Sequence, residues 1–120
     1  MDPRVQRTIT RMEEQLHRTL PVAELADAVG LSVAHLTRLF RADTGMTPGA
    51  FLHERRMSRA RLLVERTSLP IATVMAQVGI SDRSHFARDF RRAHGSSPRA
   101  LRVQQGNSPL GRWHIQHDGG

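Results

Sequence analysis

The side chains best suited to binding a partner in this 120-residue chain are its arginines. All 18 basic residues are arginine, and the formal net charge is +7. Five arginines against two acidic residues give +3 over positions 50–69, and six against two give +4 over positions 80–102. Guanidinium groups are planar and carry several N–H donors, which suits them to phosphate and to guanine. A G/C-rich genome explains arginine in place of lysine, but the uneven placement of the charge favours an anionic partner.

The histidines and the missing cysteines bear on metal binding and catalysis. His53 and Glu54 begin an H-E-x-x-H pattern, but position 57 is not histidine, so this zinc motif fails. His114 and His117 are three residues apart and have no further ligand nearby in the sequence. The absence of cysteine excludes disulfides, thiolate zinc sites and a cysteine nucleophile. With no catalytic carboxylate pair or nucleophile–base pair either, we predict no metal, no cofactor and no enzymatic activity.

Length and composition limit the architecture. A chain of 120 residues fits one compact domain, or two very small subdomains that share a core. Apolar residues make up 38% of the chain, and no run approaches the roughly eighteen that a membrane-spanning helix needs. The first residues contain no apolar stretch of signal-peptide length, so we expect a cytoplasmic protein.

Apolar residues recur with helical spacing along most of the chain. Val5, Ile9, Met12 and Leu16 are four, three and four positions apart, which predicts a first helix starting near Pro3. Similar runs predict about seven helices, of which the longest covers roughly positions 48–67 and the last ends near position 103. No tight hairpin turn separates alternating runs. The predicted fold class is therefore all-α.

One thirteen-residue pattern occurs twice, as LPVAELADAVGLS from position 20 and LPIATVMAQVGIS from position 69. Each copy predicts a short helix, a turn at a glycine and a second helix. The second helix is capped by Ser32 in the first copy and by Ser81 or Asp82 in the second. This is the helix-turn-helix pattern, whose second helix can enter a DNA major groove. The exposed first turn of that helix can then reach base edges.

The similarity of the two copies continues beyond the turn. There the offset becomes 50, which pairs Arg38 with Arg88 and Phe40 with Phe90, so one extra residue precedes the second recognition helix. A lone helix-turn-helix pattern is a weak signal, whereas a duplicated one rarely arises by chance. We predict two homeodomain-like subdomains at residues 1–49 and 68–103, a linking helix at 50–67 and a disordered tail at 104–120, with Trp113 as its one anchor.

These features resemble the DNA-binding domain of the AraC/XylS family of bacterial transcription regulators, over about residues 5–102. That family has two helix-turn-helix units joined by a long helix. The residues that carry the resemblance are Leu25-Ala26, Val29-Gly30, Ser32, Leu36, Arg38, Phe40, Gly45, Pro48, Phe51-Leu52, Arg56-Met57, Ala60, Leu63-Val64, Ile71, Val78-Gly79, Ser81, Phe86, Arg88-Asp89-Phe90, Gly95, Ser97-Pro98 and Arg102.

Three positions depart from the family pattern. Met75 stands where alanine is usual, and Ile80 replaces the usual phenylalanine after the glycine. The larger Met75 would overpack the turn at a cost of about 1–3 kcal/mol, but the smaller Ile80 could compensate for its volume. Leu101 stands where tyrosine is common, an exchange expected to be mild.

The resemblance implies that the exposed first half of each recognition helix contacts bases. Matched by position, the base-contacting residues are Ala34, Thr37 and Arg38 in the first helix and Arg83, Ser84, His85 and Arg88 in the second. Residues further along both helices suit phosphate contacts, namely Arg41, Arg91 and Arg92.

A structural role is the alternative for each of these residues. An arginine can simply lie on a solvated helix face or pair with a nearby acid, and this is the favoured reading for Arg55, Arg59 and Arg61. Arg56, at a family-matched position, is expected to brace the two halves of the chain. His85 could equally contact DNA or pack against its own helix.

We therefore predict a sequence-specific transcription regulator that binds double-stranded DNA as a monomer, with its recognition helices in two successive major grooves. Contact with RNA polymerase and a location at the nucleoid are implied by the resemblance.

Most relatives also carry a ligand-sensing domain. The chain is therefore expected to be either a stand-alone regulator or a fragment of a longer one, and Met1 directly before the first helix favours the first. The alternative is a protein-binding module or anti-activator with weakened DNA reading, which Met75 and the net charge of −1 over residues 21–49 (two arginines against three acids) favour.

Overall fold

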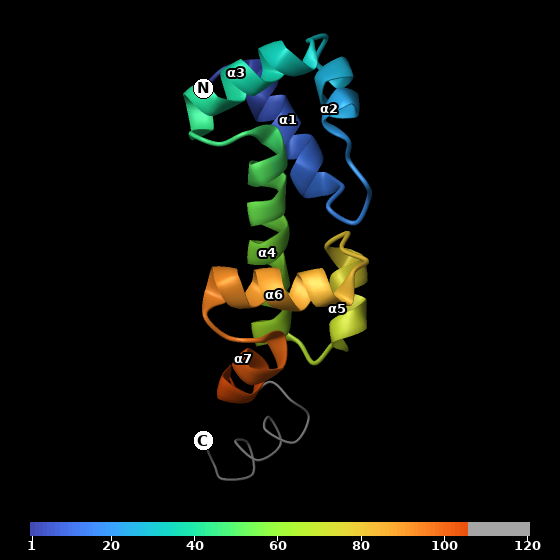
Figure 1. Cartoon of the computed structure of the whole chain (residues 1–120). Helices are drawn as coiled ribbons and strands as arrows, with labels where there is room; N and C mark the ends of the chain where they lie inside the picture. Colours follow the sequence, from blue (N-terminus) through green and yellow to red (C-terminus); the bar gives the residue numbers. More distant parts are fainter. Residues whose placement is uncertain (106–120) are drawn as a thin grey trace. The chain divides into compact units, whose positions relative to one another are not determined.

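The computed structural model describes residues 1–105, which form seven α-helices and no strand (Figure 1). The helices are α1 (Pro3–Glu14), α2 (Val22–Ala28), α3 (Val33–Thr44), α4 (Pro48–Arg66), α5 (Ile71–Gln77), α6 (Arg83–His94) and α7 (Pro98–Gln105). The all-α prediction is confirmed, and α7 runs two residues past its predicted end. The rest of the predicted disordered tail, with Trp113, His114 and His117, lies outside the described residues. No helix within residues 1–105 is long and apolar enough to cross a membrane.

The chain divides into two compact units, and the boundary falls inside α4, between Arg56 and Met57. The first unit contains α1, α2, α3 and the first part of α4, and the second contains the rest of α4 with α5, α6 and α7. Each unit has its own cluster of buried apolar side chains. The first part of α4 therefore contributes side chains to one core, and the rest of α4 contributes side chains to the other.

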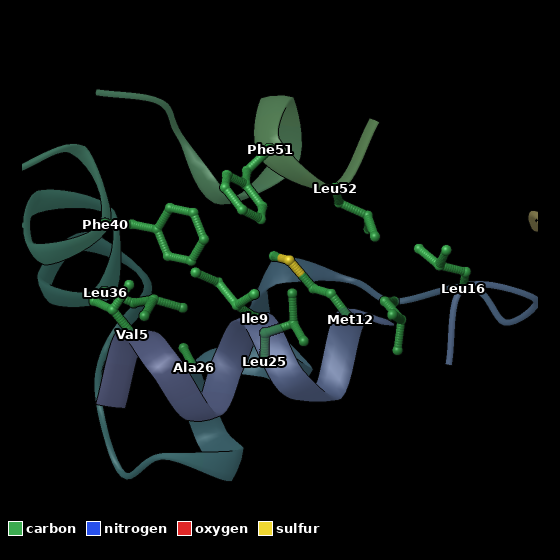
Figure 2. Close-up of a cluster of buried hydrophobic side chains, with 11 residues drawn as sticks. Val5, Ile9, Met12, Leu16, Leu25, Ala26, Leu36, Phe40, Phe51 and Leu52 are labelled. Atoms are coloured by element: carbon green, nitrogen blue, oxygen red, sulfur yellow. The ribbon is translucent and has the colours of Figure 1, made fainter. Parts of the chain in front are cut away.

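The core of the first unit forms where α1, α2, α3 and α4 meet. Figure 2 shows Ile9 and Met12 of α1 pointing toward Phe51 and Leu52 of α4. The rings of Phe40 and Phe51 meet edge to face, with centroids 5.1 Å apart, an arrangement that aromatic pairs favour. The buried residues of this cluster are Val5, Ile9, Met12, Leu16, Leu20, Leu25, Ala26, Leu36, Phe40, Phe51 and Leu52.

The core of the second unit repeats this plan with different side chains. Its buried residues are Met57, Ala60, Val64, Val74, Met75, Val78, Phe86, Phe90 and Leu101. Met75, which departs from the family pattern, is 6% exposed, and Ile80 is partly buried against the same cluster. The larger methionine is therefore accommodated inside the core, in the same cluster as the smaller isoleucine.

The turn between the two helices of each helix-turn-helix is the same in both units. Gly30 and Gly79 adopt φ values of 71° and 75°, a left-handed conformation that glycine adopts with little strain. The N–H of the next residue donates to a carbonyl five residues earlier, Leu31 to Ala26 and Ile80 to Met75, at 3.0 Å in both cases. This hydrogen bond is the mark of the Schellman motif, which ends a helix and reverses the chain.

In each unit, one arginine of the helix that follows the helix-turn-helix donates to the loop that precedes it. In the first unit Nη2 of Arg56 donates to the carbonyl oxygen of Arg18 at 2.6 Å. In the second, Arg102 donates to the carbonyl oxygens of Val64 (3.2 Å) and Leu69 (2.5 Å). Burial lowers the pKa of both guanidinium groups below the ordinary arginine value. The hydrogen bond of Arg56 lies within the first unit, so the predicted bracing of the two halves by this residue stays untested.

Candidate nucleic-acid interface

The recognition helix of the first unit, α3, begins at a side-chain cap. Ser32 Oγ accepts the N–H of His35 at 3.1 Å, which confirms the predicted N-cap. Leu36 and Phe40 are fully buried, so α3 is fixed against the core along one side. The opposite side carries the predicted contact residues at helical spacings of three and four: Ala34, Thr37, Arg38 and Arg41.

The predicted contact residues of α3 differ in exposure. Ala34, Arg38 and Arg41 are exposed, whereas Thr37 is half-buried and its hydroxyl donates to the Val33 carbonyl oxygen at 2.8 Å. Because the hydroxyl proton is already donated, Thr37 can offer a ligand its methyl group and the lone pairs of its hydroxyl oxygen.

The recognition helix of the second unit, α6, is capped by Asp82 and not by Ser81. One carboxylate oxygen of Asp82 accepts the N–H of His85 at 2.9 Å. That hydrogen bond lowers the pKa of Asp82 below its usual value, and the nearby charges of His85 and Arg88 lower it further. Asp82 therefore carries a negative charge at the start of α6, where the helix dipole favours one.

All the predicted contact residues of α6 are exposed: Arg83, Ser84, His85, Arg88, Arg91 and Arg92. Phe86 and Phe90 are buried, and they hold the helix against the core. His85 is exposed, with Nδ1 lying 3.8 Å from Asp82 Oδ2. The side chain of His85 therefore lies outside the core and beside Asp82, and its contact with DNA stays a prediction.

The arginines of residues 1–105 fall into two groups. Those outside the recognition helices often serve the fold: Arg55 lies 4.7 Å from the centroid of the Phe51 ring and pairs with Glu13 at 3.5 Å, and Arg61 pairs with Glu65. By contrast, the arginines of α3 and α6 make no hydrogen bond or ion pair with other side chains or backbone of residues 1–105: Arg38, Arg41, Arg83, Arg88, Arg91 and Arg92. Arg59, on α4, is also exposed and makes none within the same residues.

A depression with a volume of about 460 Å³ lies along α6 and the segment that leads into α7. It is lined by Ala87, Arg88, Arg91, Arg92 and Ser97. The hydroxyl of Ser97 accepts the N–H of Ala100 at 3.1 Å, so it is occupied as the cap of α7. The hydrogen-bond donors that this depression offers a ligand are therefore three guanidinium groups and the proton of the Ser97 hydroxyl.

Sequence reasoning did not single out Val33, the first residue of α3, which is 41% exposed. Val33 lies one and four positions before Ala34 and Thr37, beside the predicted contact residues. Val33 lies three and seven positions before Leu36 and Phe40, the spacing of one apolar helix face, so no sequence signal of its exposure was available. No group of three or more potential metal ligands occurs within residues 1–105.

Both the sequence and the fold match known proteins. A family model described as a helix-turn-helix domain matches residues 25–104. The solved structure of an AraC-type DNA-binding domain-containing regulator from Chromobacterium violaceum is 31% identical and matches with a TM-score of 0.79, over 86% of this chain and 92% of that chain. The chain belongs to the AraC/XylS family of helix-turn-helix DNA-binding domains. This family consists of DNA-binding transcription regulators and not of enzymes.

Two further relatives of this AraC-type domain are a curated regulatory protein and a DNA-binding domain solved with its target DNA. The arabinose operon regulatory protein of Escherichia coli K12 is 35% identical over 104 residues, which cover 86% of this chain and 36% of that protein. The DNA-binding domain of AdpA, solved in complex with a target DNA, is 30% identical with a TM-score of 0.80, over 87% of this chain and 93% of that chain. This AraC-type domain spans about a third of the length of the curated relatives it matches.

Proposed function

We propose that this domain binds double-stranded DNA at specific sequences and regulates transcription, with α3 and α6 each placed in a major groove. The observation that carries the proposal is that all six arginines of these two helices are exposed and make no hydrogen bond or ion pair within residues 1–105. Each recognition helix is also held by two buried core residues, which would keep its outer face rigid. A family relative solved with a target DNA supports the same conclusion.

Within this proposal the exposed residues have different roles. Arg38 and Arg88 are suited to guanine, because a guanidinium can donate two hydrogen bonds to the O6 and N7 atoms of that base. Ala34, Thr37 and Val33 offer methyl groups, which suit the thymine methyl. Arg41, Arg91 and Arg92 follow later in their helices and suit phosphates, which set the register of the protein on DNA.

The remaining parts of the proposal follow from the family alone. They are a monomeric bound state, contact with RNA polymerase and a location in the bacterial cytoplasm at the nucleoid. The alternative of a protein-binding module rested partly on Met75 as a sign of a damaged second unit. Met75 lies within a complete core, and the comparisons offer this alternative no support.

Selection of bound duplexes from a random DNA pool tests the proposal. The wild-type chain is expected to enrich an asymmetric site with two half-sites about one helical turn apart. Arg38→Ala is expected to relax base preference in one half-site and Arg88→Ala in the other, by about 1–3 kcal/mol, or roughly 5- to 150-fold in discrimination. Each variant should fold like the wild type, because both arginines are exposed and neither makes a hydrogen bond or an ion pair within residues 1–105.

Arg59→Ala is the matched control for this selection. Arg59 is an exposed arginine on α4 without a partner in the described part of the chain, so its removal changes the net charge equally. The site selected by Arg59→Ala should equal that of the wild type. An unchanged site in both Arg38→Ala and Arg88→Ala would contradict the assignment of these two residues to bases.

A further inference from the structure

The last residue of α6 anchors this recognition helix to α4 inside the second unit. Nε2 of His94 lies 3.0 Å from the carbonyl oxygen of Met57, the first residue of that unit. A carbonyl oxygen only accepts hydrogen bonds, so Nε2 carries the proton and donates it. The side chain of Met57 is buried in the second core. The acceptor for His94 therefore belongs to a part of α4 that is fixed by its own packing.

The His94 ring is also held by packing. Its centroid lies 4.6 Å from that of the fully buried Phe90, and the two rings meet edge to face at an interplanar angle of 71°. Aromatic pairs favour this arrangement. One ring contact and one hydrogen bond together restrict the imidazole, so they give the C-terminal end of α6 a defined position relative to α4 within the second unit.

The matched residue of the first unit makes no such contact within residues 1–105. It is Thr44, at an offset of 50, and its hydroxyl donates to the carbonyl oxygen of Phe40 at 2.7 Å and accepts the N–H of Met46 at 3.1 Å. Both partners lie on its own helix or in the turn that follows. The end of α3 is instead joined to the start of α1, where Asp43 accepts the N–H of Asp2 at 2.8 Å in an exposed position. A half-buried histidine anchor is thus particular to α6.

The position of this anchor matters for the opposite end of α6. The helix has twelve residues, so its first turn lies about 16 Å from its last residue. A tilt of about 10° about His94 would displace the first turn by about 3 Å, which is the length of a hydrogen bond. Three of the residues predicted to contact bases lie at this turn: Arg83, Ser84 and His85.

We infer that His94 is a positioning residue for DNA recognition by the second unit. It touches no base itself, and it acts by holding α6 at the angle at which the first turn of the helix reaches the base edges. This inference rests on the proposed function. Without the hydrogen bond α6 adopts further orientations, and the apparent affinity falls with the fraction of molecules in the competent one. The net energy of one hydrogen bond limits that fall to about two- to tenfold.

His94→Phe tests the inference, because it removes the hydrogen bond and keeps an aromatic ring beside Phe90. At a temperature well below unfolding, which circular dichroism locates, its preference for the half-site that Arg88→Ala relaxes should fall about two- to tenfold. Its preference in the other half-site and its affinity for random duplex DNA should equal those of the wild type, because no exposed contact residue is lost. His94→Gln should restore the preference, since an amide N–H can donate to the same carbonyl oxygen.

Thr44→Val is the matched control in the first unit. It should leave the base preference of both half-sites unchanged, because the hydroxyl contacts only its own helix and the following turn. An unchanged preference in His94→Phe would overturn the inference. Equal losses in both half-sites, or on random DNA, would also overturn it, because they would report a general loss of folded protein.

The tautomer of His94 tests the anchor without a variant and without DNA. Long-range ¹H–¹⁵N NMR spectra of the full chain are expected to show the proton on Nε2. A neutral ring with its proton on Nδ1 would overturn the inference, since Nε2 could not then donate to Met57. A wild-type chain without base preference would contradict the proposed function, whereas a preference that His94→Phe leaves unchanged would contradict this inference alone.

Discussion

Phe90→Ala is expected to lower the free energy of unfolding by about 3–5 kcal/mol. The Phe90 side chain is fully buried at the centre of the second core, where its ring centroid lies 5.6 Å from that of Phe86 and 4.6 Å from that of His94. Alanine would remove these contacts and leave a cavity that the surrounding side chains cannot fill. Urea unfolding of the full chain, followed by circular dichroism, measures the change.

Phe40→Ala provides the matched comparison, because the repeat pairs Phe40 with Phe90 and Phe40 is equally buried in the first core. We expect a loss of similar size, about 3–5 kcal/mol. Since the two cores are separate clusters, the two variants should destabilise different units, which amide hydrogen exchange can distinguish. A loss below about 1 kcal/mol in either variant would show that its phenylalanine is not at the centre of a packed core.

Arg102→Met is expected to lower the free energy of unfolding by about 2 kcal/mol, within the range of hydrogen bonds that involve a charged group. The guanidinium of Arg102 donates to the carbonyl oxygens of Val64 and Leu69, and so joins α7 to the end of α4 and to the loop before α5. Methionine keeps an apolar stem of similar length, so the loss reports mainly on the hydrogen bonds. Thermal or urea unfolding is the measurement.

Arg99→Met is the control for this prediction. Arg99 lies on the same helix, is exposed and makes no hydrogen bond within residues 1–105, so its replacement should change stability by less than about 0.5 kcal/mol. If Arg99→Met and Arg102→Met destabilised the chain equally, the two carbonyl contacts would not contribute to folding.

Local patterns made most of the fold predictable from the sequence. The four-and-three spacing of Val5, Ile9 and Met12 predicted α1, and all seven helices expected from such patterns are present in residues 1–105. The glycine turn and the Ser32 cap are also local, because each depends on residues within a few positions of one another. The cap of α6 was ambiguous, because the extra residue of the second copy left Ser81 and Asp82 as equivalent candidates.

Interactions between distant residues were not predictable in the same way. Arg56 and Arg102 donate to backbone carbonyls 33 to 38 positions away, and a carbonyl leaves no signal in a sequence because every residue has one. The depression on α6 likewise depends on how the segment before α7 folds beside it. The division of α4 between two cores depends on which core each of its residues packs into. The individual DNA contacts stay predictions.

Binding of the selected duplex with and without five extra base pairs between its half-sites tests most directly whether α3 and α6 read one DNA together. Five base pairs rotate one half-site by about half a turn, so the two helices could no longer occupy both grooves. The affinity is expected to fall at least about tenfold, to that of a duplex with a single half-site. Equal affinity for both duplexes would contradict two-helix recognition of a specific site.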